Sequence, residues 1–245
     1  MNGGTGSELY GSFMFMEQHR KSLIFYFVFL AIAAAGIVYG GQLIDDYPSL
    51  RLWPWSNIAL LLIGLPFVFL QKPVGLPAVW DEQIPVTKRI VQPVLIGLLF
   101  GLADWLLIEF VLRQEPHNGL PPYTQPFPYS VFLYSSGAFE IEVFYRLVPV
   151  TIVLLLFTKI REGRYWLHAF WTIAILSSLR EPIEQLPGGP TWFIVYAFLS
   201  GFAMNFLQVW YYRKAGFSAS LFLRLGHYLI WHIFNGWLIE NGWLS

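Results

Sequence analysis

Cysteine is absent from this chain of 245 residues, which excludes disulfide bonds, thiolate metal sites and cysteine nucleophiles. Charge is scarce as well, since charged residues make up 12% of the chain and hydrophobic residues 56%. That composition is typical of a membrane protein and not of a soluble one. Fifteen basic and fifteen acidic residues give a formal net charge of zero, so no global field favours a nucleic acid as a partner.

Long apolar runs are the dominant feature of the sequence. A helix needs about 20 residues to cross the hydrocarbon core, and seven runs approach or exceed that length: 22–41, 55–71, 90–112, 131–158, 165–179, 191–211 and 219–238. The first lacks the short apolar region and cleavage site of a signal peptide, so we expect it to be retained. The sequence predicts an all-α, polytopic membrane bundle with about seven transmembrane helices. Residues 1–21 form a polar cytoplasmic segment and 22–245 a single membrane domain.

The basic residues predict the orientation of this bundle. Cytoplasmic connections collect Lys and Arg, and a cytoplasmic N-terminus leaves only Arg51 and Arg113 on the far side. It places eleven basic residues in the cytoplasm: Arg20, Lys21, Lys72, Lys88, Arg89, Lys159, Arg161, Arg164, Arg213, Lys214 and Arg224. We therefore expect seven spans with the N-terminus inside and the C-terminus outside.

Run 131–158 carries three charged residues, Glu140, Glu142 and Arg146. A charge at that depth is costly and marks a candidate functional site. Glu142 and Arg146 are four residues apart and share a helix face, which predicts an ion pair. Glu140 lies about 200° around the helix from Glu142, so it faces elsewhere. The two glutamates are therefore predicted to have different roles, and an unpaired one suits general base catalysis.

Other polar residues fall at overlapping depths, given a rise of about 1.5 Å per helical residue. They are Asp104, Arg180, Glu184, His227, His232 and Asn235. The two late histidines are about 140° apart on an α-helix, so both are not expected to point squarely at one centre. A histidine inside a bundle can orient water, stabilise an oxyanion with asparagine, or ligate a metal or tetrapyrrole. The structural alternative is a hydrogen bond across helices.

Residues 137–236 resemble the CPBP family of CAAX-processing and bacteriocin-immunity membrane proteases. The segment from Ile141 to Arg146 is similar to that family's Glu-Glu-x-x-x-Arg motif. Residues 198–216 resemble its glycine-containing span and following turn, and a last span with His227, His232 and Asn235 follows in the same order. The resemblance implies a glutamate intramembrane protease fold with a core at about 131–238.

The motifs depart from the family pattern at the catalytic positions. Ile141 stands where the family has its first glutamate. In the second motif, Glu181 replaces phenylalanine and Gln185 replaces histidine, and glutamine cannot relay a proton. His232 and Asn235 are three residues apart instead of four. The fold is therefore expected to carry over better than the chemistry.

Two functions follow from the resemblance. The first is a divergent, catalytically impaired member that acts as a binding or scaffold subunit of a membrane assembly. The second is an active endopeptidase that cleaves the peptide ends of membrane-associated substrates. In that enzyme Glu142 or Glu140 would activate water, His227 or His232 would polarise the carbonyl, and Asn235 would hold the oxyanion. Arg146 would support the site, with a secondary polar layer of Arg180, Glu181, Glu184 and Asp104.

A transporter is a third possibility, with a path along Asp104, Glu109, Glu142 and Arg180. The sequence contains no His-Glu-x-x-His pattern, so we expect no metal. No cofactor is predicted, although haem or chlorophyll ligation by His168, His227 or His232 stays open. The expected partners are the lipid bilayer, other membrane subunits and a peptide substrate. A prokaryotic inner membrane is the expected location, because the resembling family is abundant there.

Overall fold

The computed structural model describes residues 5–47, 49–112, 120 and 123–244. Every regular element in these residues is helical, and no strand occurs among them. The main helices are α1 Thr5–Leu43, α2 Trp55–Leu62, α3 Leu65–Leu70, α4 Gln92–Leu106, α5 Tyr129–Glu142, α6 Val148–Lys159, α7 Trp166–Glu184, α8 Thr191–Ala215, α9 Phe217–Tyr228 and α10 Asn235–Glu240. The expectation of an all-α chain is confirmed for the described residues.

Short helical turns join several of these helices end to end. Two are 3-10 turns, Lys72–Val74 and Ile160–Gly163; four are π turns, Thr87–Val91, Leu107–Leu112, Val143–Leu147 and Leu229–Phe234. The π turns Val143–Leu147 and Leu229–Phe234 join α5 to α6 and α9 to α10, and α2 and α3 form one apolar helix, Trp55–Leu70. Counted in this way, the described helices form seven rods, one for each apolar run in the sequence. α1 begins at Thr5, so this helix extends well ahead of the apolar run at 22–41.

Four helices are long and apolar enough to cross a membrane, by length and composition. They are Glu17–Leu43, Thr87–Leu112, Tyr129–Lys159 and Thr191–Ala215. On α4 the exposed leucines follow helical spacing, at Leu95, Leu99, Leu102 and Leu106. An exposed apolar stripe of this kind fits contact with lipid. The fold is that of an integral membrane protein.

The ends of the helices follow from local chemistry. Pro54 and Pro190, both in extended conformation, precede α2 and α8, because proline fits the start of a helix and not its interior. α8 stops at Gly216, whose φ of 86° favours glycine. A Cβ at Gly216 would also lie 2.6 Å from the carbonyl oxygen of Ala78. The sharp turn between α8 and α9 therefore depends on this glycine.

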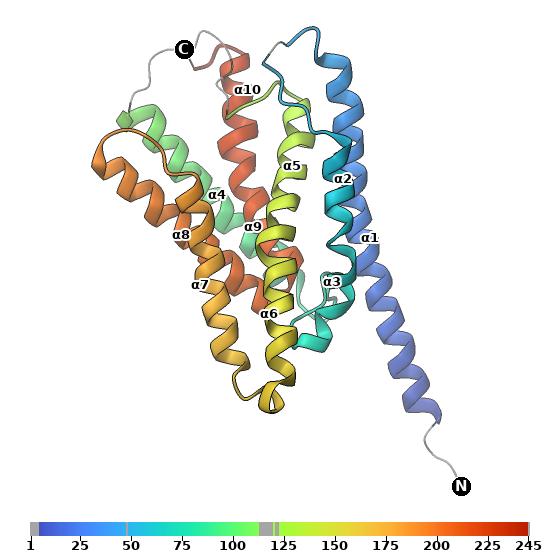
Figure 1. Ribbon diagram of the computed structural model, residues 1–245. Coiled ribbons are helices and arrows are strands. Elements are labelled where there is room, and N and C mark those ends of the chain that lie inside the picture. Colours follow the sequence, from blue (N-terminus) through green and yellow to red (C-terminus); the bar gives the residue numbers. More distant parts are fainter. Residues whose placement is uncertain (1–4, 48, 113–119, 121–122, 245) are drawn as a thin grey trace.

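Figure 1 shows how the rods are arranged: α5–α6 and α9 run through the middle, α1 and α2 flank one side, and α7 and α8 flank the other. α9 contacts α4, α5 and α8, while α5 also packs on α1. α9 is thus the central helix, and side chains from four rods meet around it.

α4 and α9 approach each other closely enough for backbone contact. A Cβ added at Gly97 would collide with the carbonyl oxygen of Leu223, and one at Gly226 would collide with that of Val94. Small residues permit such close helix crossings in membrane proteins. This crossing fixes Asp104, two turns further along α4, beside α9.

Candidate functional site

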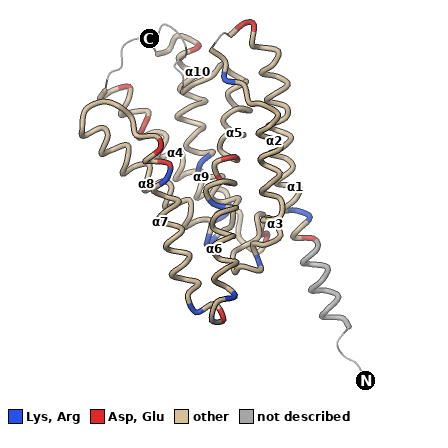
Figure 2. Tube along the Cα trace, in the orientation of Figure 1, with Lys and Arg blue, Asp and Glu red and all other residues tan. Residues whose placement is uncertain are grey.

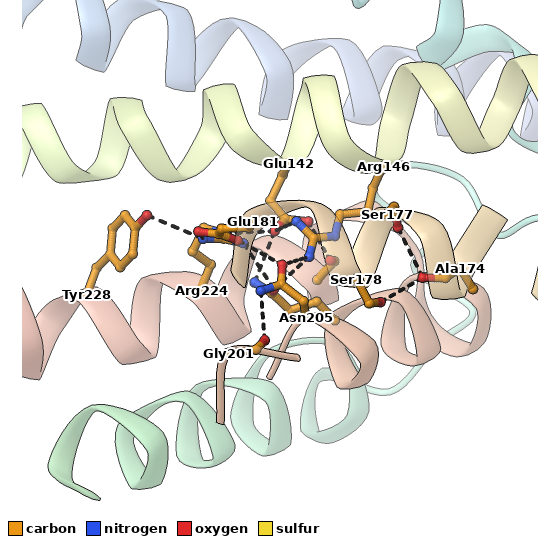
Figure 3. Close-up of polar contacts among 12 residues, drawn as sticks. Glu142, Arg146, Ala174, Ser177, Ser178, Glu181, Gly201, Asn205, Arg224 and Tyr228 are labelled. Atoms are coloured by element: carbon orange, nitrogen blue, oxygen red, sulfur yellow. Dashed lines mark hydrogen bonds and ion pairs between the residues drawn. The ribbon is translucent and has the colours of Figure 1, made fainter. Parts of the chain in front are cut away.

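A network of four charged side chains lies at the centre of the bundle. Glu142 ends α5, Arg146 sits in the following π turn, Glu181 is on α7 and Arg224 is on α9. Figure 3 shows these side chains converging with Asn205 of α8. Glu142, Arg146 and Arg224 are completely buried, and Glu181 is 6% exposed. The two formal positive charges equal the two formal negative ones.

Glu142 is fully occupied by protein donors. It accepts hydrogen bonds from Arg146 Nη1 at 3.1 Å, Arg224 Nε at 3.0 Å and Gln208 Nε2 at 3.0 Å. Ser220 Oγ donates to its second oxygen. The ion pair predicted between Glu142 and Arg146 is therefore present, as one part of a larger set of contacts.

Arg224 joins two helices through its planar guanidinium. Its Nη1 and Nη2 bind the two oxygens of Glu181 at 2.6 and 2.5 Å, a bidentate pair. The side-chain oxygens of Asn205 and Gln208 accept hydrogen bonds from both Arg224 and Arg146. Each acceptor oxygen of the network receives a donor, and Arg146 Nε is its one buried polar atom without a partner among the described residues. A network so nearly complete can serve as a structural element without a substrate.

Arg224, counted with the basic residues of the cytoplasmic side, belongs to the interior of the bundle. It lies seven residues into α9, about 10 Å from the helix start, and it is completely buried. Sorting the basic residues between the two sides of the membrane left it out of the buried polar group. The signal that would have found it is the polar stripe Ser220, Arg224, His227 and Tyr228, which follows helical spacing on one face.

A cavity of about 570 Å³ lies beside this network. Its wall on α5 is one helix face, comprising Leu133, Tyr134, Gly137, Glu140 and Ile141. The other walls come from α4, α7, α8, the α9 rod and the segments that carry Arg51 and Tyr123. Glu181 and Asn205 reach the cavity, but Glu142 and Arg146 do not line it. The two glutamates of run 131–158 are thus separated, as their angular spacing predicted.

Asp104 and His227 form a pair on the cavity wall. Asp104 Oδ2 is 2.8 Å from His227 Nε2, and Asp104 Oδ1 accepts a hydrogen bond from the Tyr196 hydroxyl at 2.8 Å. Nδ1 of His227 is buried without a partner among the described residues. Glu140 is half-buried on the same cavity, and within the described part of the chain no hydrogen bond or ion pair reaches its carboxylate.

His232 lines the same cavity through different contacts. Its Nδ1 donates to the carbonyl oxygen of Tyr123 at 2.6 Å, and its ring stacks on Tyr134 with centroids 4.2 Å apart. Burial raises the pKa of the Tyr123 phenol, which keeps that side chain neutral. Both histidines reach one cavity because the π turn Leu229–Phe234 winds less per residue than an α-helix. The expected divergence of about 140° assumed a regular α-helix.

Several predicted site residues lie away from the cavity and the network. Asn235 is completely buried, does not line the cavity, and its side-chain atoms have no partner among the described residues. Arg180 and Glu184 form an exposed pair at 2.8 Å, and Glu184 accepts a hydrogen bond from Tyr145. Arg180 and Glu181 diverge because adjacent helical residues are about 100° apart. The single polar layer predicted from depth is therefore divided into separate groups.

The residues considered for pigment or metal binding are dispersed. His168 lines a separate groove of about 270 Å³ between α6 and α7, among Val153, Phe157 and Ile173. His227 and His232 are held by Asp104 and Tyr123. In the described ranges, no three His, Asp or Glu side chains gather closely enough to hold a metal ion.

Comparison with known proteins adds no identification. No protein-family model matches this chain. No curated protein matches it in sequence, and no solved structure matches it in fold.

Proposed function

We propose that this chain is a seven-span integral membrane protein with a CPBP-like fold, which binds a ligand in its central cavity and does not hydrolyse peptides. The retained half of the motif, Glu142 and Arg146, serves to hold the helices together. The cavity beside it provides the binding site. Its volume of about 570 Å³ falls in the range of small-molecule sites.

The observation that carries this proposal is the position of the motif residues relative to the cavity. Ile141 and Gln185 both line it, at the two positions where the resembling family has its glutamate and its histidine. Neither side chain can act as a general base at these positions. Glu142, which could, is completely buried and bound by four donors. The cavity is retained while the family's reactive groups are replaced or enclosed.

The orientation proposed for the seven spans has the N-terminus in the cytoplasm. With Arg224 removed from the count, ten basic residues remain on that side, and Arg51 lies on the other; Arg113 is outside the described residues. Figure 2 shows Lys and Arg at the end of the bundle with the α6–α7 connection, and Asp and Glu at the turn that follows α1. This distribution of charge supports a cytoplasmic location for the end of the bundle that carries the α6–α7 connection. A prokaryotic inner membrane is proposed from the family resemblance.

A second candidate function, an intramembrane endopeptidase with displaced machinery, is favoured by the polar cavity wall. Glu140 is free to take a proton from water, which would then attack a carbonyl carbon. Protonated Glu140 would then pass that proton to the leaving amine, while Asp104, at 2.8 Å, holds His227 on the same cavity wall. In this enzyme Glu140 would be the catalytic residue and His227 a positioning residue, and Glu142 would have no part in the reaction.

Mild detergent extraction followed by native mass spectrometry tests the binding function. We expect the wild-type protein to carry a bound small molecule, and Gly137→Phe to lose it, because Gly137 lines the cavity and a Cβ there has open space around it. Gly41→Phe is the matched control, since a Cβ at Gly41 also meets nothing but lies on α1, away from the cavity. An empty wild-type protein contradicts ligand binding.

A peptidase assay in lipid nanodiscs separates the two functions. A panel of prenylated and membrane-tethered peptides should remain intact with the wild-type protein. Cleavage that is lost in both Glu140→Gln and His227→Ala, with Glu184→Gln unaffected, would establish the endopeptidase instead. Glu184 is a suitable control because its carboxylate is exposed.

A further inference from the structure

We infer that the ligand of the central cavity is a monovalent organic cation, with an ammonium head held by Glu140 and an apolar body along the aromatic wall. This inference rests on the proposed binding function and specifies its ligand. It follows from the charges, the rings and the length of the cavity.

Three carboxylates line the cavity, those of Asp104, Glu140 and Glu181. Glu181 is neutralised by the bidentate contact with Arg224. Asp104 receives hydrogen bonds from Tyr196 and from His227. Glu140 alone among the lining carboxylates has no ion pair or hydrogen bond to any described residue. A carboxylate inside a membrane bundle is costly to leave without a counter-charge, and a ligand cation would supply one.

The cavity that Glu140 lines is rich in aromatic rings. Seven aromatic side chains line it: Trp53, Tyr123, Tyr134, Phe193, Tyr196, Tyr228 and Trp231. Aromatic faces attract ammonium and quaternary ammonium groups, most strongly where water is excluded. Two of these rings are held in place by packing, since Tyr123 stacks on Trp231 with centroids 5.3 Å apart. A wall of this composition fits an organic cation better than a hydrated metal ion.

The cavity carries opposite charges near its two ends. The α5 wall runs from Leu133 to Ile141, about 12 Å at the rise of an α-helix. Glu140 lies near one end of this wall, whereas Arg51 stands over Tyr134 near the other, 5.7 Å from the ring centroid. A ligand with its cationic head at Glu140 therefore extends its body toward Arg51. A second positive charge on that body would meet Arg51, which selects for a single charge.

Isothermal titration into protein-loaded nanodiscs tests this inference, with empty nanodiscs as the correction for partition into lipid. The probes are trimethyl(4-phenylbutyl)ammonium, the neutral 4-phenylbutanol and the anionic 4-phenylbutanoate. We expect saturable binding of the ammonium and at least about tenfold weaker binding of the other two, in line with the strength of a charge-assisted contact. A bis-quaternary ammonium of similar length should also bind more weakly.

Two substitutions locate the cation. Glu140→Gln should weaken ammonium binding about tenfold or more, while Glu184→Gln, an exposed carboxylate on α7, should leave it unchanged. Trp231→Leu should weaken the quaternary ammonium by several fold through loss of a ring. Unchanged melting temperatures would show that the variants are folded.

The possible outcomes distinguish this inference from the function on which it rests. Equal binding of the ammonium and the alcohol, or full ammonium affinity in Glu140→Gln, overturns the cation while leaving a ligand-binding cavity. If no probe binds saturably, the inference that the ligand is an organic cation is overturned as well. An empty cavity in the mass spectrometry described above instead overturns the binding function itself.

Discussion

Arg224 is the residue on which the central network depends most. It contacts the carboxylates of Glu142 and Glu181, which lie on different rods. Arg224 and Glu142 are both completely buried. Removing one member of a buried ion pair leaves its partner as an uncompensated charge, which costs more than the pair itself contributes. Removal of Arg224 would leave two carboxylates short of a partner.

Arg224→Leu should therefore lower the free energy of unfolding by about 3–5 kcal/mol. Unfolding in mixed micelles, followed by tryptophan fluorescence, measures this change. Arg180→Leu is the matched control, because it removes an arginine from an exposed pair with Glu184, for which about 0–1 kcal/mol is expected. Equal losses in the two variants would show that the network does not stabilise the fold.

The contacts of these residues also show which interactions a sequence can predict. The pair of Glu142 and Arg146 was predictable because four-residue spacing is a local property of one helix. The contact of Glu181 with Arg224 spans 43 positions, and it depends on how α8 packs against both α7 and α9. The angular separation of Glu140 and Glu142 predicted that their side chains would face different surroundings. It did not predict which of the two would face a cavity.

At the scale of the element, the crossing of α4 and α9 depends on two glycines. A Cβ added at Gly226 would lie only 3.2 Å from the Cα of Gly97. Such a crossing has no room for a side chain, and neighbouring backbone cannot yield as a flexible side chain can. The position of Asp104 relative to His227 follows from this contact.

Gly226→Leu should separate α4 from α9 and destabilise the protein by several kcal/mol, as overpacking of a tight contact does. It should also break the contact between Asp104 and His227. Yield and melting temperature after detergent extraction measure the first effect. Gly41→Ala, where an added Cβ meets nothing, should match or exceed the wild-type protein in stability. A Gly226→Leu protein as stable as the wild type would contradict the close crossing.

The helices were predictable where apolar runs are long, and less so where their winding changes. All seven apolar runs correspond to helical rods in the described residues. The π turns Val143–Leu147 and Leu229–Phe234 have no sequence signal that periodicity detects, since neither turn contains a glycine or proline that would mark a change of winding. These turns alter which side chains share a face, and this is why both late histidines reach one cavity.

For the whole molecule, the absence of cysteine permits a direct test of orientation. Asp45 follows α1 and Glu162 lies in the α6–α7 connection, and both side chains are exposed. In intact cells, Asp45→Cys should react with a membrane-impermeant maleimide, and Glu162→Cys should react only after permeabilisation. The reverse pattern would place the N-terminus outside. The unmodified chain is the blank, because it contains no thiol.

The cavity was the feature of the whole molecule that the sequence did not predict. Overlapping depths grouped Asp104, His227 and His232, which all line the cavity, because depth follows from helical rise. Depth does not specify rotation, and so it grouped Arg180 and Glu184 with residues that they do not contact. Enclosed space depends on the packing of five rods, which no local pattern encodes.

The order in which the network's residues leave the ribosome has a consequence for biosynthesis. Glu142, Arg146 and Glu181 are translated well before Arg224, which belongs to the last rod. Until α9 is inserted, Glu181 lacks its bidentate partner, so the earlier spans enter the membrane with an uncompensated negative charge. Completion of the network therefore awaits α9, the helix that brings Arg224 to Glu181.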